Sequence, residues 1–287
     1  MHRKLRGRSG CGKSGSLAGV IDLAAYLARI GYAGDRAPTL ATLHAVVRAH
    51  VQAIPFENLD VLLGRPISLA PADLEAKLVT ERRGGYCFEH NGLLLLVLEQ
   101  LGFAVRPISA RVRYQRPRDF TPPRTHLFAR VELDGEAWIA DVGVGAMSPT
   151  AALRLAEPGE QPTPHEPRRF LREGGLVYHQ VRFGTEWHDI WESTLEEMPP
   201  IDREVANWFT STHPGSHFKN RLLVARALPE GRVTLLNREL THRAPDGTPR
   251  TRVIHTPDGL LDVLRDEFGL AFPAGTRFTC PALDWPG

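Results

Sequence analysis

The first third of the chain repeats apolar residues at the period of an amphipathic helix. Its clearest stripe recurs at intervals of three and four residues and comprises Leu40, Leu43, Val47, Val51 and Ile54. Pro55 follows this stripe and predicts its end, and Pro71 is well placed to begin another helix because its missing N–H does no harm there. We therefore expect helices over most of residues 21–101.

A long apolar helix is expected after the segment Arg83-Gly84-Gly85-Tyr86-Cys87-Phe88-Glu89-His90-Asn91. Leu93 to Leu98 form an unbroken apolar run, and Gly102 beyond it is typical of a helix C-terminus. The glycines on either side of the run place Cys87 at or just inside the N-terminus of this helix.

Beyond Gly102 the apolar period changes to two, which is typical of strands. We predict strands at residues 105–114, 125–133, 136–142, 176–183, 222–227 and 232–236, and a last helix at 259–268. Asp134-Gly135 between two of these runs is a strong signal for a tight hairpin turn. A helical first third, a β-rich middle and a mixed last third predict an α+β protein.

Composition and charge limit the class of partner. The 287 residues are 42% hydrophobic and 24% charged, and a net charge of +2 is too small to predict nucleic-acid binding. Arginines between Arg106 and Arg130 would either attract an anionic ligand or form a solvated strand face. The longest apolar run, Leu93 to Leu98, is far too short to span a bilayer, so no membrane partner is expected.

Cysteine usage favours a reducing compartment. Cys11, Cys87 and Cys280 are too few and too scattered for a disulfide framework or a zinc cluster, so no metal is expected. The basic N-terminus lacks an apolar core and a small-residue cleavage site, so no secretory signal is predicted. We therefore expect a cytoplasmic protein in which one well-placed thiol acts as a nucleophile, with Cys280 inert or partly exposed.

The N-terminal stretch Gly7 to Ser14 has the spacing of a phosphate-binding loop. Such a loop needs a buried strand before it and a helix directly after it. Residues 1–6 are a charged stub, and Gly15-Ser16 follow the stretch, so neither requirement is met. Residues 1–19 are instead interpreted as a disordered basic extension and the spacing as fortuitous.

The predicted hairpin supplies a possible histidine and acid for Cys87. If Asp134-Gly135 is a two-residue loop, the ladder sets Phe128 opposite Asp141, which makes His126 a diagonal neighbour of Asp141 on the same face. Asp141 would then hold one nitrogen of His126 while the other takes the proton of Cys87. The alternative is that His126 is a structural histidine, because spacing alone does not show that Cys87 reaches it.

Several blocks, in order, resemble the arylamine N-acetyltransferases over roughly residues 20–225. The segment 83–91 resembles the active-site signature of that family. The other matching blocks are Ile54-Pro-Phe-Glu-Asn-Leu-Asp60, Ala110-Arg-Val112, Thr125-His126-Leu, Asp141-Val-Gly-Val-Gly145 and Asn207-Trp-Phe-Thr-Ser-Thr-His-Pro214. The basic extension lies outside the resemblance.

The resemblance implies an architecture and a reaction. It implies a helical bundle at residues 20–104, a β-barrel at 105–212 and an α/β lid at 213–287, around a cysteine-protease-like triad of Cys87, His126 and Asp141. It also implies ping-pong acetyl transfer from acetyl-CoA, a co-substrate and not a permanently bound cofactor, to an arylamine or arylhydrazine nitrogen. The oligomeric state is left open.

The resemblance also implies binding positions. Those expected to line the acceptor pocket are Phe56, Val112, Val144 and Phe218, and those expected to bind CoA are Gly143 and Gly145. Relatives commonly have phenylalanine where this chain has Val144, so a roomier pocket is expected. Arg83 and Glu57 are expected to form an ion pair between two motif blocks, with simple surface exposure as the alternative.

Other functions remain open at this point. A cysteine hydrolase or an acyltransferase with another donor or acceptor would use the same triad. A small-molecule binder would not need Cys87, and a nucleotide hydrolase would need Lys13. Acceptor dependence and Cys87→Ala separate these possibilities.

Overall fold

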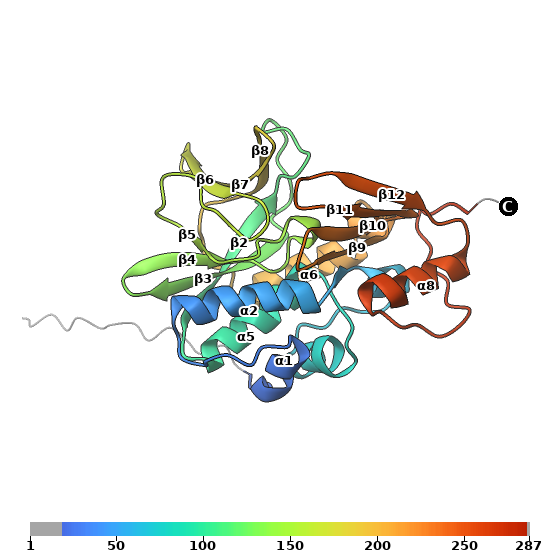
Figure 1. Cartoon of the computed structure of the whole chain (residues 1–287), viewed down its shortest axis with the longest axis horizontal. Helices are drawn as coiled ribbons and strands as arrows, with labels where there is room; N and C mark the ends of the chain where they lie inside the picture. Colours follow the sequence, from blue (N-terminus) through green and yellow to red (C-terminus); the bar gives the residue numbers. More distant parts are fainter. Residues whose placement is uncertain (1–18, 286–287) are drawn as a thin grey trace, which may run out of the picture.

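The computed structural model describes residues 19–285. The phosphate-loop stretch from Gly7 to Ser14 and Cys11 lie outside the described residues. Three parts follow one another along the chain: a helical region, a curved sheet and a second sheet with its helices, as Figure 1 shows.

The helical region precedes residue 101. Its elements are α1 (Leu23–Arg29), α2 (Leu40–Ala53), α3 (Leu59–Leu62), α4 (Pro71–Glu75), η1 (Ala76–Thr80) and α5 (Cys87–Gln100). The predicted stripe forms α2, which ends before Pro55 as expected, and α4 begins at Pro71. η1 is a π-helical turn that continues α4 and leads toward the nucleophile segment.

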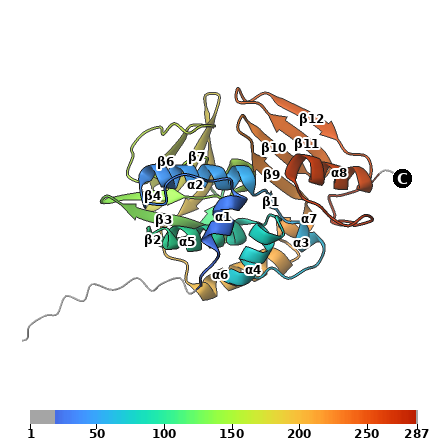
Figure 2. The ribbon, with the colours of Figure 1, turned by 60° about the horizontal axis from the view of Figure 1, so that its bottom comes forward.

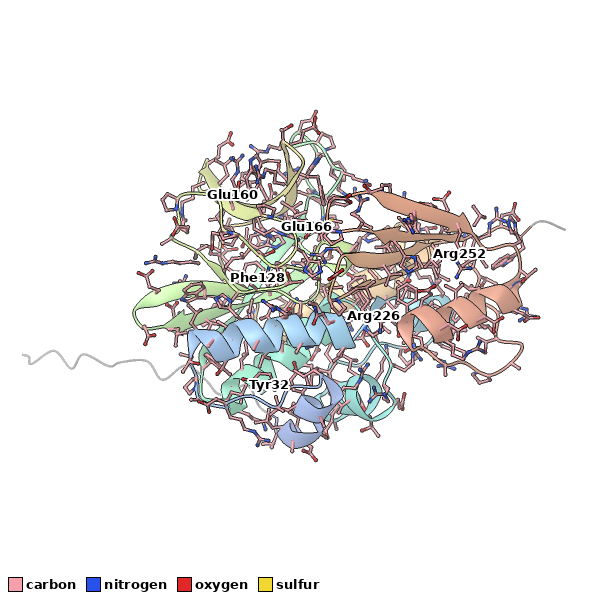
Figure 3. The ribbon with its side chains drawn as sticks, viewed as in Figure 1. Tyr32, Phe128, Glu160, Glu166, Arg226 and Arg252 are labelled. Carbon is pink, nitrogen blue, oxygen red and sulfur yellow. The ribbon has the colours of Figure 1, made fainter. Side chains whose placement is uncertain are left out.

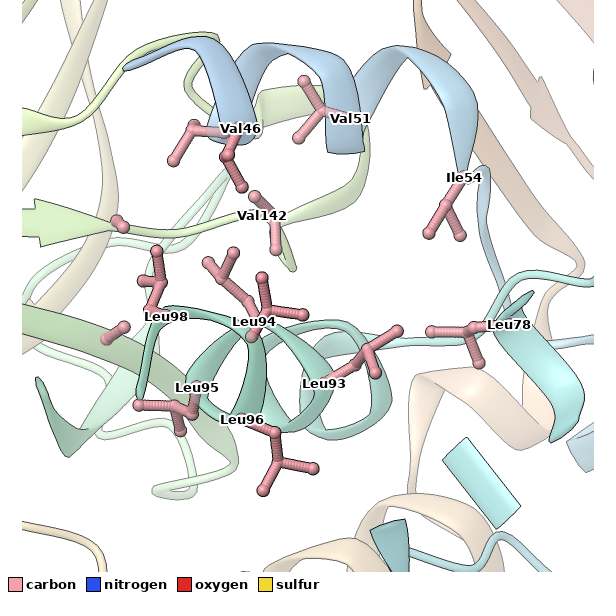
Figure 4. Packing of buried hydrophobic residues seen from close by; sticks show 14 of the residues in the cluster. Val46, Val51, Ile54, Leu78, Leu93, Leu94, Leu95, Leu96, Leu98 and Val142 are labelled. Carbon is pink, nitrogen blue, oxygen red and sulfur yellow. The ribbon is translucent and has the colours of Figure 1, made fainter. Parts of the chain in front are cut away.

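α5 is the buried centre of the molecule. Its residues from Leu93 to Leu98 are all buried, as expected for a helix that is apolar on every side. Figure 4 shows α2 crossing above α5, with Val46 and Val51 facing Leu94 and Val142 between the two helices. Packing on all sides fixes the position of this helix and hence of Cys87 at its first turn.

The middle of the chain forms a curved antiparallel sheet in the order β5-β4-β3-β2-β8-β7-β6. Its strands are β2 (Ala104–Val112), β3 (His126–Leu133), β4 (Glu136–Ala140), β5 (Leu153–Arg154), β6 (Arg168–Glu173), β7 (Leu176–Phe183) and β8 (Glu186–Ser193). Its interior holds a separate apolar cluster that includes Phe128, Ile139 and Trp191.

The hairpin register matches the sequence prediction. Leu133 pairs with Glu136 and Ala129 with Ala140, as the predicted register requires, and the ladder ends there, just before Asp141. Asp134 and Gly135 have φ of 52° and 78°, the left-handed values of a two-residue hairpin turn. The turn thus fixes which face of the sheet His126 and Asp141 occupy.

The last part of the chain forms a second sheet, to which an early strand is added. β1 (Phe56–Glu57) pairs with β9 (Leu223–Ala227), which is followed in the sheet by β10 (Arg232–Leu236), β11 (Glu239–Arg243) and β12 (Pro249–Val253). Figure 2 shows α8 (Pro257–Phe268) packed on this sheet, and Gly269 is the left-handed cap of that helix. α6 (Pro200–Thr212) and α7 (His217–Asn220) precede the sheet in the chain.

The apolar pattern did not predict every element. The strands β1, β5, β6, β8, β11 and β12 and the helices α6 and α7 were not expected from it. Residues 200–212 fall within the range expected for the barrel, and they form α6. Short strands give too few alternations to be recognised, and β8 pairs across a register irregularity at His179/Gln180.

Candidate active site

Cys87 is the first residue of α5 and is buried, with 4% of its surface exposed. The Glu89 carboxylate accepts a hydrogen bond of 2.9 Å from the Tyr86 N–H and so fixes the start of the helix. The Cys87 sulfur lies 3.5 Å from the Thr125 carbonyl, beside β3. The thiol therefore sits where the N-terminus of α5 meets the strand that carries His126.

His126 and Asp141 form a buried pair. His126 Nε2 donates to Asp141 Oδ2 across 2.8 Å, and both side chains are almost completely excluded from solvent. His126 Nδ1 is therefore the nitrogen left for Cys87, which lies close enough to the ring to help raise its pKa. The structure thus brings the three predicted residues together.

The electrostatics of this cluster favour a charged imidazole. Burial opposes the charge on His126, but Asp141 and then Cys87 outweigh it and raise the pKa of His126 to about 10. Burial likewise opposes the charge on Asp141, but His126, Asn91 and the Gly143 N–H lower its pKa below the ordinary value. Each charge is kept inside the protein by the other.

Asn91 joins the nucleophile helix to the acid. Its Nδ2 donates to the Leu127 carbonyl at 2.6 Å and to Asp141 Oδ1 at 2.9 Å, and its Oδ1 accepts from the Val142 N–H at 3.0 Å. Asn91 lies one helical turn beyond Cys87 on α5 and thus on the same helix face. That spacing was the signal by which the sequence could have identified it.

Trp191 on β8 holds Asp141 from the interior of the barrel. Its Nε1 donates to Asp141 Oδ2 across 3.0 Å, and its ring stacks on Phe128 with centroids 4.5 Å apart. Asp141 therefore accepts hydrogen bonds from four groups, on His126, Asn91, Gly143 and Trp191. Trp191 was not identified from the sequence, because its strand was not predicted.

A second buried polar chain also starts from α5. His90 Nε2 lies 3.2 Å from the Pro55 carbonyl, His90 Nδ1 lies 2.8 Å from His50 Nε2, and His50 Nδ1 lies 2.8 Å from the Tyr26 hydroxyl. A carbonyl can only accept, so the Pro55 oxygen places the proton of His90 on Nε2. His50 then donates to His90, and Tyr26 donates to His50. Burial lowers the pKa of His90 to about 4, which keeps its ring neutral.

Two of the expected pocket residues lie against the nucleophile segment. The rings of Phe56 and Phe218 have centroids 6.0 Å apart, and Phe218 lies 5.4 Å from the ring of Tyr86. Phe56 and Phe218 are both buried. They form an aromatic wall that comes from two different parts of the chain.

The other expected pocket and CoA positions lie on strand ends and on the turn after β4. Val112 ends β2 and pairs with Trp191 of β8. Val144 precedes the 3-10 turn η2 (Gly145–Met147), and a Cβ on Gly145 would lie 3.1 Å from the Phe56 ring. This turn therefore runs beside the aromatic wall.

Gly143 is required by its closeness to the nucleophile. A Cβ built on Gly143 would lie 2.8 Å from Cys87 Cα and 2.5 Å from Asn91 Nδ2, which is too close for any side chain. The sequence prediction assigned this glycine to the approach of the donor. The structure gives it a further reason, the direct packing of its backbone on the start of α5.

Arg83 and Glu57 form the expected ion pair, at 2.7 Å, with both side chains buried. Arg83 also contacts Asp60, at 3.2 Å, and Lys77 bridges Asp60 and Glu89. Because Glu89 caps α5, these pairs connect the segment of β1 to the helix that carries Cys87.

Within residues 19–285, no group of three or more His, Cys, Asp or Glu side chains is arranged to hold a metal ion. In the same part of the chain, no helix is both long and apolar enough to cross a membrane.

Comparison with known proteins gives matches over most of the chain. A family model described as N-acetyltransferase matches residues 39–276. An arylamine N-acetyltransferase of Mycolicibacterium smegmatis is 43% identical over 254 residues, which is 87% of this chain and 92% of the relative. One of Escherichia coli K12 is 42% identical over 246 residues, 85% of this chain and 87% of the relative.

Solved structures give the same result for the fold. The structure of Mycobacterium marinum arylamine N-acetyltransferase in complex with CoA matches with a TM-score of 0.83 and 40% identity, over 86% of this chain and 92% of that one. The enzyme of Salmonella typhimurium matches with a TM-score of 0.84 and 37% identity, over 92% and 97% of the two chains. The predicted α+β fold is thereby confirmed.

Proposed function

We propose, from the premise that this chain belongs to the arylamine N-acetyltransferase family, that it uses Cys87, His126 and Asp141 to transfer acetyl from acetyl-CoA to arylamine or arylhydrazine nitrogen. The observation that carries the proposal is the buried His126–Asp141 hydrogen bond of 2.8 Å beside the Cys87 thiol. Acetyl-CoA is a co-substrate, and CoA is present in the related Mycobacterium marinum structure.

In the first step the Cys87 thiolate attacks the carbonyl carbon of the acetyl thioester. The bond from that carbon to the CoA sulfur breaks, and His126 Nδ1 gives its proton to the departing sulfur. Donor and product are both thioesters, so the step is nearly balanced in free energy. Backbone N–H groups around Cys87 would stabilise the tetrahedral oxyanion, and removing such a donor typically costs ~3 to 4 kcal/mol.

In the second step the acceptor nitrogen attacks the acetyl carbon on Cys87. Now-neutral His126 takes the proton from the nitrogen, and the carbon–sulfur bond to Cys87 breaks. The thiolate and the imidazolium are thereby restored, with Asp141 holding the ring in one orientation throughout. Amide formation draws this step forward, because an amide is more stable than a thioester.

The acceptor is proposed to bind against the aromatic wall. Phe56 and Phe218 offer flat apolar surfaces suited to an aryl ring, with Val112 and Val144 as further lining. Valine at position 144 would leave more room than the phenylalanine common in the family. Gly143 and Gly145 are proposed to let CoA approach the backbone beside Cys87.

The proposal is tested by mass spectrometry of the purified protein after exposure to acetyl-CoA alone. We expect one added acetyl group on the peptide that contains Cys87, and its removal when an arylamine such as aniline is added. Cys280→Ala is the matched control and should acetylate normally, whereas Cys87→Ala should not. Acetylation elsewhere, or turnover without it, would contradict the proposal, and loss of acetyl to water without an acceptor would indicate a hydrolase.

We also propose a reducing, cytoplasmic location and small-molecule partners only. Cys87 and Cys280 are free thiols, and a nucleophilic thiol must remain reduced to act. Fractionation of cells that produce the chain should recover acetyl transfer with cytoplasmic markers.

A further inference from the structure

Beyond the triad, the structure contains a buried cluster of two arginines around one carboxylate. Arg168 lies at the start of β6 and is completely buried, and Arg232 at the start of β10 is 3% exposed. Glu166 lies between them: Arg232 contacts its two oxygens at 2.7 and 2.6 Å, and Arg168 contacts one at 3.1 Å. Figure 3 labels Glu166 between the barrel and the C-terminal sheet.

Both arginines also hold the turn that follows the triad acid. Arg168 Nη1 donates to the Met147 carbonyl at 2.8 Å, and Arg232 Nη2 donates to the Ser148 carbonyl at 2.9 Å. These carbonyls belong to consecutive residues at the end of η2. Guanidinium groups from two different sheets therefore fix the same short piece of backbone.

The turn passes this constraint on to the site. The Ser148 side chain accepts from the Val144 N–H at 3.0 Å, and Ser148 N–H donates to the Gly145 carbonyl at 3.1 Å. At its other end the turn begins at Gly143, whose backbone packs on Cys87 and donates to Asp141. Displacement of residues 144–148 would therefore change the space next to Phe56 and Cys87.

The triad acid, in contrast, has its own supports. Three of the four groups that hold Asp141, those on His126, Asn91 and Trp191, lie outside the turn and do not contact Glu166, and the fourth is the Gly143 N–H. Loss of the cluster should thus leave the nucleophile and its base in place while it loosens the turn. Removing Glu166 alone would also leave two buried cations close together without their shared counter-charge.

We propose that Glu166, Arg168 and Arg232 are positioning residues that hold the 144–148 turn and thereby set the affinity for the acceptor. Their side-chain hydrogen bonds go to one another and to the Met147 and Ser148 carbonyls, through which they act. The proposal rests on the proposed function, since acceptor turnover is one of its readouts.

The test uses Glu166→Gln in the full chain, with Glu173→Gln as the matched control. Glu173 also binds an arginine, Arg118, at 2.6 Å, but it is exposed and far along β6 from the turn. Acetyl-enzyme is formed first and then mixed with increasing aniline. We expect the aniline concentration for half-maximal deacetylation to rise about tenfold or more in Glu166→Gln, with the maximal rate within about threefold of the original.

A second readout is independent of turnover. Amide hydrogen exchange at residues 144–148 should become about tenfold faster in Glu166→Gln, with α5 unchanged, and alkylation of Cys87 by iodoacetamide should keep its rate and pH profile. Arg232→Lys keeps the charge and one donor, so it should restore part of the affinity that Arg232→Met loses. If Glu166→Gln does not fold, the comparison of Arg232→Lys with Arg232→Met tests the same positioning role.

Failure of the proposed function and failure of the positioning role give different results. If the unaltered protein forms no acetyl-Cys87, the proposed function fails, yet the exchange experiment still tests the cluster. Unchanged exchange at 144–148 in a folded variant would overturn the positioning role. So would an equal loss in Glu173→Gln, or a loss confined to the maximal rate.

Discussion

Two buried histidine networks share α5, and they hold their rings in opposite charge states. Burial disfavours the charged form in both, yet the pKa of His126 is raised to about 10 and that of His90 is lowered to about 4. The difference is the Asp141 carboxylate, since His90 hydrogen-bonds the Pro55 carbonyl and the His50 ring, and the charges that act on it, on Lys77 and Arg29, are positive. One buried carboxylate, and not the degree of burial, therefore decides which histidine can give a proton to chemistry.

The largest expected effect comes from removing that carboxylate's charge. Asp141→Asn retains the size of the side chain but cannot stabilise the imidazolium. We expect acetyl-Cys87 formation to slow by about 10³- to 10⁴-fold, as for loss of the orienting acid in other triads. Stopped-flow measurement of CoA release checks the rate, and NMR titration should show the pKa of His126 falling from about 10 toward its ordinary value.

Asp189→Asn is the matched control for that substitution. Asp189 lies on β8 of the same barrel and binds Arg118 at 2.7 Å, away from His126. It should acetylate at nearly the original rate. Equal losses in the two variants would mean that Asp141 acts only by stabilising the barrel, and the comparison would then fail.

Both histidine networks should make the free energy of unfolding depend on pH. A raised pKa means that His126 contributes stability below the ordinary value of 6.5, and this is lost as pH rises toward about 10. A lowered pKa means that His90 contributes stability above 6.5, and this is lost as pH falls toward about 4. The free energy of unfolding should fall on both sides, by up to about 1.4 kcal/mol per pH unit for each proton.

Urea denaturation between pH 4 and pH 10 measures both falls in the free energy of unfolding, the one at low pH (the acid arm) and the one at high pH (the alkaline arm). In Asp141→Asn the alkaline arm should flatten while the acid arm persists. An alkaline arm that is unchanged in Asp141→Asn would show that His126 is not its source.

The smallest expected effect is on the neutral network. Tyr26→Phe removes the donor to His50 Nδ1 and leaves that buried nitrogen unpaired, which costs about 1 to 3 kcal/mol of folding free energy. Acetyl transfer should stay within about twofold, because no reacting atom belongs to this chain. Thermal or urea unfolding together with a steady-state assay measures the two quantities.

Tyr32→Phe provides the control for the same change of side chain. The Tyr32 hydroxyl donates to the Asp35 carbonyl at an exposed site, so its loss should cost only a few tenths of a kcal/mol. A large loss of activity in Tyr26→Phe at full folding would instead place the neutral network in the chemistry.

The parts of the site that depend on local sequence were predictable. The Asp134-Gly135 turn fixes the register that puts His126 beside Asp141, and the glycines around 84–85 mark the start of α5. Trp191, in contrast, lies on a strand that pairs with β2 from far along the chain. No spacing in the sequence indicates that Trp191 reaches Asp141.

Ion pairs also divide into those that local sequence predicts and those that depend on tertiary packing. The Arg83–Glu57 pair was expected because both residues lie in recognisable motif blocks. Glu166 lies just before β6 and Arg232 begins β10, 66 residues later, so their contact depends on how the barrel packs against the last part of the chain. Tertiary packing of this kind is not encoded in any local period.

The two residues of β1 have a consequence for the modularity of this enzyme. Phe56 belongs by sequence to the helical region, yet its backbone is paired with Ala225. The C-terminal part is therefore no detachable cover: a shortened chain that ends before α7 would lose Phe218 and also leave Phe56 without its partner strand β9. Any exchange of that part between relatives to alter acceptor choice has to carry the residues around position 56 with it.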